Sequence, residues 1–332
     1  MTKYLIKKTL GWLLMIFLAT NLAYLLAASF LDPRSNYTGR RPPLSPEEIN
    51  SLLEPYNLSP DTPLVQRWWT WLTNILTKWD WGQSPVGEVV NSEISYRIWV
   101  SAQLLLLSTI LSILIGVAVG VYTASRQYKT GDRIWQGISI IAMNTHVVVA
   151  SIAVVWGALK INELTGKKIF YVVGSHSLDV EGFFPKLMDS AQHLVLPTIS
   201  LVFISYASYH MTQRTLLLDN LDADYVRTAR AKGLTERGVL YGHVFRNAML
   251  IVIAGFPSLF LGVFFGSSIL IETIFSLDGL GRLGFEAAVQ RDYPVIFGTL
   301  YVFGLMGLLV GILSDLTYVL VDPRIDFEKR AG

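Results

Sequence analysis

Six long apolar runs set the main limit on how this chain can fold. A helix needs about 20 apolar residues to cross roughly 30 Å of hydrocarbon. The runs that meet this requirement are Thr9–Phe30, Ile98–Thr123, Ile134–Leu159, Leu194–Met211, Ala248–Ile271 and Val295–Val321. Composition agrees, because 52% of the residues are hydrophobic and only 16% are charged, whereas soluble domains are nearer a quarter charged. The sequence therefore predicts an all-α polytopic membrane protein with six transmembrane helices.

The positions of Lys and Arg predict the orientation of these helices. If the N-terminus is cytoplasmic, the inner segments hold 15 of the 27 basic residues in the smaller share of the loop length, as the positive-inside rule requires. Both termini are then cytoplasmic. The first run exceeds the apolar core of a secretory signal, which favours a retained helix over a cleaved leader. We predict a first helix over 1–30, an outer loop region over 31–97, and a helical core over 98–332 that contains an inner loop, 214–247.

The outer loop region carries signals for short helices. Ser45, Pro46 and Glu48 form the start of a helix with both partners of a capping box. After Pro63, apolar residues recur at helical spacing with tryptophans beside them. This pattern has two interpretations that the sequence leaves open: an amphipathic helix lying on the outer membrane surface, or a small packed outer subdomain with tryptophan in its core.

Several classes of function are disfavoured. The chain has no cysteine, which excludes disulfides and thiolate sites. No phosphate-binding G-x-x-x-x-G-K-[ST] loop is present. Ion-coupled carriers usually bury ionisable groups in the membrane, but Asp315 is the only acid within a predicted span. An ATP-independent carrier or channel is therefore the weaker alternative, and energy for active transport would come from another protein.

The largest inner loop predicts a helix, a glycine bend and a second helix. Residues Tyr225–Lys232 favour helix, Gly233 suits a left-handed C-cap, and Thr235 can cap the next helix. Tyr225 and Ala229 share one face, and the small residues Ala229 and Ala231 would let the surface of another protein approach closely. From the residues alone, a solvated basic loop or a helix resting on anionic lipid remains the simpler interpretation.

The same loop, DYVRTARAKGLTERGVLYGHVFRNAM, resembles the "EAA" loop of ABC importer permeases in the form carried by the dipeptide and oligopeptide (OppB/DppB) type. Other segments resemble the same family: LSPDTPLVQRWWTWL with WDWGQS, HLVLPTISL, IETIFSLDGLGRLGFEAAVQRDYP and SDLTYVLVDPRID. In one place the chain departs from the family, because MNTHVVVAS stands where a serine-x-proline is usual near the third span.

The resemblance implies the type I ABC importer permease fold in a bacterial or archaeal cytoplasmic membrane. The chain would pair with a second homologous permease, two ATPase subunits or a fused pair, and an extracytoplasmic solute-binding protein that delivers peptide. ATP and Mg would bind the partner subunits and no cofactor would bind this chain, which is not an enzyme by itself. Nucleic acid is not an expected partner. The cargo stays open between dipeptide, longer peptide, nickel and sugar.

The resemblance also implies an ATPase-coupling helix made of Tyr225, Val226, Arg227, Thr228, Ala229, Arg230, Ala231, Lys232, Gly233 and Leu234. We expect Ala229→Arg or Gly233→Pro to leave insertion intact while uncoupling ATP hydrolysis from uptake. Candidate residues of the substrate path are Tyr206, Tyr209, His210, Phe256 and Phe260, although residues of this kind are more often helix-packing residues than peptide contacts.

The string GLGRLG, residues 279–284, matches the spacing of a dinucleotide-binding turn. A span-length apolar run follows it and no acid for a ribose lies at the required distance, so we interpret the match as accidental. Its glycines predict tight bends in an outer hairpin. By resemblance this loop would gate the pore or contact the binding protein, unless it merely reverses the chain; the candidates are Glu272, Asp278, Gly279, Gly281, Arg282, Arg291 and Asp292.

Overall fold

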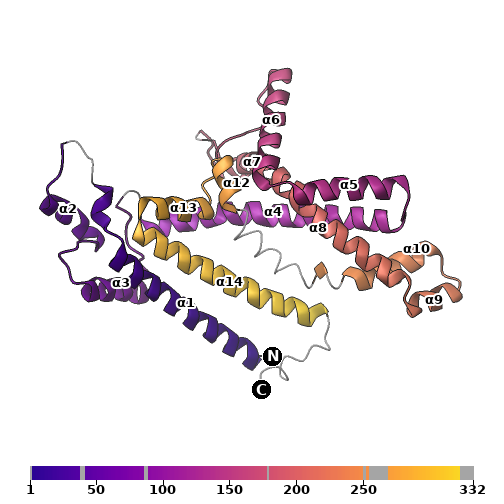
Figure 1. The fold of residues 1–332 in the computed structure, drawn as a ribbon, viewed down its shortest axis with the longest axis horizontal. Helices are drawn as coiled ribbons and strands as arrows, with labels where there is room; N and C mark the ends of the chain where they lie inside the picture. Colours follow the sequence, from indigo (N-terminus) through magenta and orange to yellow (C-terminus); the bar gives the residue numbers. More distant parts are fainter. Residues whose placement is uncertain are drawn as a thin grey trace. The chain divides into compact units, whose positions relative to one another are not determined.

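The fold is helical throughout the described part of the chain. The computed structural model describes residues 2–37, 42–85, 89–177, 179–249, 252–253 and 268–321. Within them, the only paired extended residues form an isolated bridge between Gln83 and Val89. The chain divides into two compact units, one built from Met1–Ser101 with Asp278–Ile312 and the other mainly from Ala102–Leu277. By residue number, the long helices α4 (Val90–Ala124) and α14 (Tyr293–Val321), both labelled in Figure 1, each contain residues of both units.

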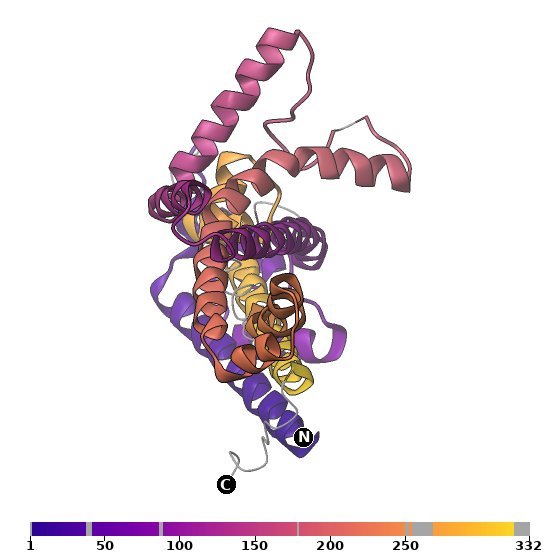
Figure 2. The same ribbon diagram turned by 90° about the vertical axis from the view of Figure 1, so that its right-hand side faces the viewer.

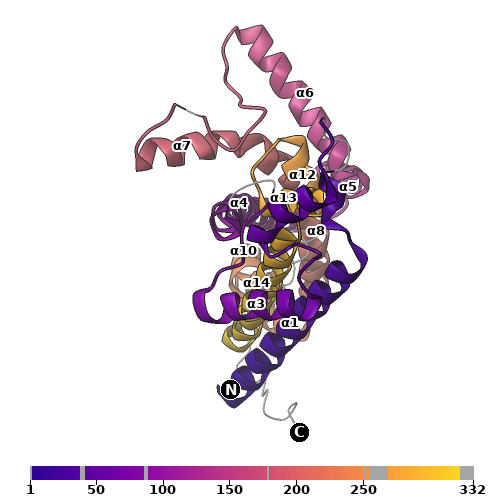
Figure 3. The same cartoon turned by 90° about the vertical axis from the view of Figure 1, so that its left-hand side faces the viewer.

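The first unit contains two span-length helices and a set of short ones. Besides parts of α4 and α14, its elements are α1 (Thr2–Phe30), η1 (Pro33–Asn36), α2 (Pro46–Leu53), η2 (Glu54–Tyr56), α3 (Leu64–Lys78) and α13 (Leu280–Gln290). The predicted capping box starts α2, since Ser45 Oγ accepts from the Glu48 backbone N–H and Glu48 Oε2 accepts from the Ser45 backbone N–H. Figure 3 shows α3 crossing α1, and the two helices are in contact.

Aromatic rings form the centre of this first unit. Trp71 of α3 is buried and stacks on Tyr24 of α1, with ring centroids 4.7 Å apart. Trp71 also meets Phe297 of α14 and Trp81 edge to face. Of the two interpretations of the tryptophan-rich segment, the structure supports the packed one, because α3 is held against two span-length helices. Its other face stays exposed at Trp69.

The second unit is a helical bundle. Its elements are the rest of α4, then α5 (Thr130–Asn144), α6 (Val147–Thr165), α7 (Phe183–His193), α8 (Val195–Leu221), α9 (Asp224–Ala231), α10 (Glu236–Val239), the π-helix η3 (Leu240–Val244) and α12 (Ser268–Ile274). The helix α8 contacts both α5 and α6. Figures 2 and 3 show α6 and α7 diverging from one end of this bundle, while α9 and α10 lie at the other end of α8.

Four described helices are long and apolar enough to cross a membrane. They are Ile6–Phe30, Val90–Ala124, Val147–Thr165 and Tyr293–Thr317, and the pair α7 and α8, bent by 46°, would make a fifth. The predicted span Ala248–Ile271 lies largely outside the described residues. The structure therefore supports a polytopic helical membrane protein, while the number six stays a prediction.

The predicted third span, Ile134–Leu159, is wrong as a single helix. Helix α5 ends at Asn144, Thr145 is extended with ψ 121°, and α6 begins after His146. The side chains of this segment stabilise the break: Thr145 Oγ1 donates to the Ile141 carbonyl, and His146 accepts from the Val148 backbone N–H. Apolar residues continue on both sides of the uncharged polar residues 144–146, so the run looked like one helix. No proline is needed for the break.

The predicted glycine bends in GLGRLG are also wrong. Gly279 is the extended N-cap of α13, and the rest of the string lies inside that helix. The left-handed residues are instead Ser276, with φ 50°, and Arg291, with φ 56°, which flank the helix. Leu280, Leu283 and Ala287 are buried at helical spacing, and burying this apolar face outweighs the weak helix propensity of the glycines.

Candidate functional site

The α9–α10 hairpin of the predicted inner loop forms as its local sequence predicts. After α9, Gly233 has φ +80°, its N–H donates to the Arg230 carbonyl, and the Leu234 N–H reaches the Ala229 carbonyl. These two bonds are the pair that a Schellman C-cap makes. Thr235 then caps α10 by accepting from the Gly238 N–H at 3.2 Å. The predicted helix, glycine bend and second cap are confirmed.

One face of α9 is fixed in an apolar cluster. Val226 is fully buried and Ala229 is 5% exposed. The cluster also contains residues of α4, α8 and α10, namely Val121, Ala124, Leu217 and Val239. In this chain Ala229 therefore packs inward, and its contact with a partner protein stays a prediction. Spacing placed Ala229 on a face with Tyr225 but could not show that this face turns inward.

The burial of Ala229 changes the expected result for Ala229→Arg. A guanidinium placed in this cluster would have no partner, so we expect a loss of stability of several kcal/mol. Ala231→Arg is the matched control, because Ala231 is exposed on the same helix, and we expect its effect to stay within about 0.5 kcal/mol. Thermal unfolding and the yield of monodisperse protein measure both. Equal stability of the two variants would contradict the packing.

The opposite face of α9 is exposed and carries two arginines. The Arg227 side chain is 73% exposed and lies 3.6 Å from Asp224 on the same helix. Arg230 forms a two-point ion pair with Glu236 of α10, at 3.0 and 3.2 Å. The exposed members of the predicted coupling segment are Arg227, Thr228, Arg230, Ala231, Lys232, Gly233 and Leu234. Tyr225 is half-buried, and its hydroxyl donates to Asn220 Oδ1.

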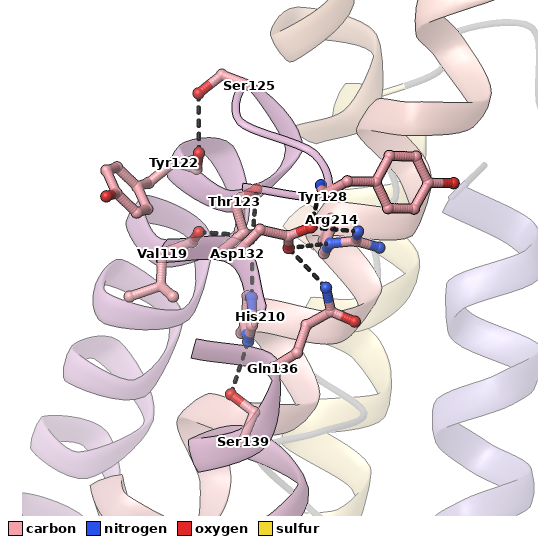
Figure 4. A network of polar contacts seen from close by, with 11 residues as sticks. Val119, Tyr122, Thr123, Ser125, Tyr128, Asp132, Gln136, Ser139, His210 and Arg214 are labelled. Carbon is pink, nitrogen blue, oxygen red and sulfur yellow. Dashed lines mark hydrogen bonds and ion pairs between the residues drawn. The ribbon is translucent and has the colours of Figure 1, made fainter. Parts of the chain in front are cut away.

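An ion pair joins α5 to α8 near the C-terminal end of α8, just before the chain enters the α9–α10 hairpin (Figure 4). Arg214 donates to both carboxylate oxygens of Asp132, at 2.8 and 2.9 Å. The Tyr128 backbone N–H and Gln136 Nε2 also donate to this carboxylate. The hydrogen bond from Arg214 lowers the pKa of Asp132 to about 2, against the opposing effect of burial. Sequence reasoning missed this pair, whose members are separated by 82 positions.

His210 joins three helices one turn away from Arg214. It is fully buried, and its ring nitrogens lie 3.0 Å from Thr123 Oγ1 of α4 and 2.6 Å from Ser139 Oγ of α5 (Figure 4). Tyr206 and Tyr209 are also buried on α8. The arrangement is that of packing residues, so their role in a substrate path stays a prediction. Phe256 and Phe260 lie outside the described residues.

Close contact between α4 and α8 depends on two glycines of α4. A Cβ on Gly116 would lie 2.5 Å from Tyr209 Cβ, and one on Gly120 would lie 2.8 Å from Gln213 Cβ. The sequence signal that could have revealed this contact is the Gly-x-x-x-Gly spacing inside an apolar run, which is typical of close helix pairs in membranes.

The residues predicted to gate the pore or contact the binding protein make structural contacts with neighbouring parts of this chain. Arg282 forms an ion pair with Glu286 on α13, with 2.7 Å between Nε and Oε1. Asp292 is buried, accepts from Ser84, and caps α14 through the Val295 N–H. Burial raises the pKa of Asp292, and these hydrogen bonds oppose the rise. Glu272, Gly279 and Gly281 are buried, Asp278 is half-buried, and only Arg291 of this set is exposed.

No metal site is evident in the described part of the chain, where no three acidic or histidine side chains gather in a way that could hold an ion.

The chain matches known transport proteins over most of its length. Residues 116–327 match the family described as "Binding-protein-dependent transport system inner membrane component". The peptidoglycan transport system permease protein YejB of Agrobacterium fabrum is 41% identical over 310 residues, covering 92% of this chain and 82% of that protein. The oligopeptide transport system permease protein OppB of Mycobacterium tuberculosis is 31% identical over 326 residues, covering 98% of this chain and 99% of that protein.

Proposed function

Because the chain belongs to the family of binding-protein-dependent transport system inner membrane components, we propose that it couples ATP hydrolysis on partner subunits to peptide uptake through α9. The observation that carries this proposal is the two-sided character of α9. One side is packed on α4, α8 and α10, while the other presents exposed basic side chains. A short helix anchored in this way can pass a rigid-body movement to the helices behind it.

The connection from α9 into the bundle supports the same proposal. Leu217 of α8 packs on α9, and Arg214, one turn earlier on α8, is bound to Asp132 of α5. His210, a further turn back, contacts α4 and α5. Successive turns of α8 therefore tie the hairpin to two other helices. A force applied to α9 would move this group of helices together.

The proposed complex contains more than this chain. We propose a second homologous permease, two ATPase subunits or a fused pair that bind ATP and Mg, and an extracytoplasmic binding protein. The chain would lie in a bacterial or archaeal cytoplasmic membrane with both termini inside, as the distribution of Lys and Arg favours. It would hydrolyse nothing itself.

The cargo we propose is a peptide. The names of the relatives support this class, since they include permeases of oligopeptide transport and of peptidoglycan transport. The higher identity to the peptidoglycan transport permease favours cell-wall peptides as a second candidate beside ordinary oligopeptides, because identity falls from 41% to 31% between these relatives.

The charge reversal Arg227→Glu tests the coupling role. We expect it to lower peptide uptake per ATP hydrolysed by about tenfold, within the range of typical coupling free energies, without loss of folded protein. The measurement is uptake and ATP hydrolysis by the complete transporter in vesicles with its binding protein present.

Arg133→Glu is the matched control, because Arg133 is an exposed arginine on another predicted inner loop. An equal loss of uptake per ATP hydrolysed in both variants would contradict the assignment of α9 as the coupling helix. Uptake that persists after deletion of the partner ATPases would instead favour an ATP-independent carrier.

A further inference from the structure

The first unit contains a deep apolar groove that neither the fold nor the coupling proposal requires. It lies between α1, α3 and α14 and has a volume of about 350 Å³. Phe17 of α1, Trp71 of α3 and Tyr301 of α14 line three of its sides. We propose that this groove binds one acyl chain of a membrane phospholipid.

The mouth of the groove is bordered by exposed apolar side chains. Leu13 and Phe17 on α1 are 38% and 41% exposed, and Leu76 and Trp79 at the end of α3 are 68% and 54% exposed. Two of the walls are helices long and apolar enough to span a membrane. At that level lipid chains replace water as the surrounding medium, so the groove opens toward lipid.

The polar side chains on the α1 wall of the groove are already used within the protein. Thr20 Oγ1 donates to the Ile16 carbonyl at 2.7 Å, and Asn21 Nδ2 donates to the Phe17 carbonyl at 2.8 Å. Asn21 Oδ1 accepts from Trp68 Nε1. A water molecule in the groove would find few partners, whereas an apolar cavity of this kind takes an apolar guest.

The lining favours an acyl chain over a peptide. Trp71 is 8% exposed, and its Nε1 atom is buried without a hydrogen-bond partner within the described chain, so this donor does not select the guest. A peptide guest fits less well, because no charged residue lines the groove to receive its ionised ends.

Photochemical cross-linking tests the site. The complete transporter would be reconstituted with a phosphatidylcholine that carries a diazirine in one acyl chain, irradiated, and mapped by mass spectrometry. We expect adducts on α1 and α3 to exceed those on the lipid-exposed face of α6, around Ile152 and Trp156, by several-fold.

Substitutions that place a larger side chain in the groove provide the matched control for the cross-linking. Leu13→Trp should lower the α1 and α3 adducts several-fold, while Leu14→Trp should not, because Leu14 is 58% exposed and does not line the groove. Leu76→Trp fills the groove from the opposite wall if Leu13→Trp does not fold. The proposal is overturned if groove adducts only match the α6 background, or if Leu13→Trp and Leu14→Trp label equally. It is also overturned if a photoreactive peptide cargo displaces the lipid.

Discussion

Replacing Arg214 by leucine is expected to destabilise the protein by about 3–5 kcal/mol, the usual result of removing one partner of a buried ion pair. The Asp132 carboxylate is fully buried, and the Arg214 side chain is only 14% exposed. Leucine would leave this carboxylate with two hydrogen bonds, from Tyr128 and Gln136, and with no counter-charge. Thermal unfolding followed by tryptophan fluorescence measures the loss.

The control for this prediction is Arg230→Leu. Arg230 also makes a two-point ion pair, with Glu236 at 3.0 Å, but the two side chains are 42% and 74% exposed, and exposed pairs contribute only about 0–1 kcal/mol. The double variant Asp132→Asn with Arg214→Leu should recover much of the lost stability, since the uncompensated charge is gone. Equal destabilisation by Arg214→Leu and Arg230→Leu would contradict the geometry of the pair.

The dependence of folding stability on pH in the acid range provides a second test of the role of Arg214. The pKa of Asp132 is lowered to about 2 in the folded protein, so its contribution is fully present above the unfolded value near 4 and is lost as pH falls through about 2. Without Arg214 the folded pKa rises toward or above the unfolded value. The pH of half-unfolding should therefore move upward in Arg214→Leu but not in Arg230→Leu.

Adding a single methyl group at Gly116 is expected to push α4 away from α8. The new Cβ of Gly116→Ala would lie 2.6 Å from the Tyr206 carbonyl oxygen as well as 2.5 Å from Tyr209 Cβ. Backbone atoms cannot rotate away, so the helices must separate. We expect a loss of about 1–3 kcal/mol from overpacking, with weakening of the contacts that His210 makes to Thr123.

Where a glycine has open space around it, the same substitution to alanine is expected to raise stability instead of lowering it. Gly137 lies inside α5, and a Cβ there would meet nothing within 4 Å. Gly137→Ala should therefore stabilise the protein by roughly 0.5–1 kcal/mol through helix propensity. Thermal unfolding in the same detergent compares the two variants. A stabilised Gly116→Ala variant would show that α4 and α8 do not approach as closely as the structure has them.

Local chemistry explains what could be predicted from the sequence. The capping box at Ser45 and the C-cap at Gly233 were readable because their partners lie within a few residues. The inward orientation of Ala229 and the Asp132–Arg214 ion pair could not be predicted, since both depend on contacts between distant segments. The break at Thr145 was hidden because apolar residues continue on both sides of it.

The length of α4 has a mechanical consequence. Its 35 residues make a rod about 52 Å long at 1.5 Å per residue. Fitting that rod inside roughly 30 Å of hydrocarbon by tilt alone would require roughly 55°, beyond the 0–40° found for membrane helices. Both ends of α4 must therefore stand in or near water. A rotation imposed at its C-terminal end, where Val121 and Ala124 pack on α9, is applied to one continuous helix.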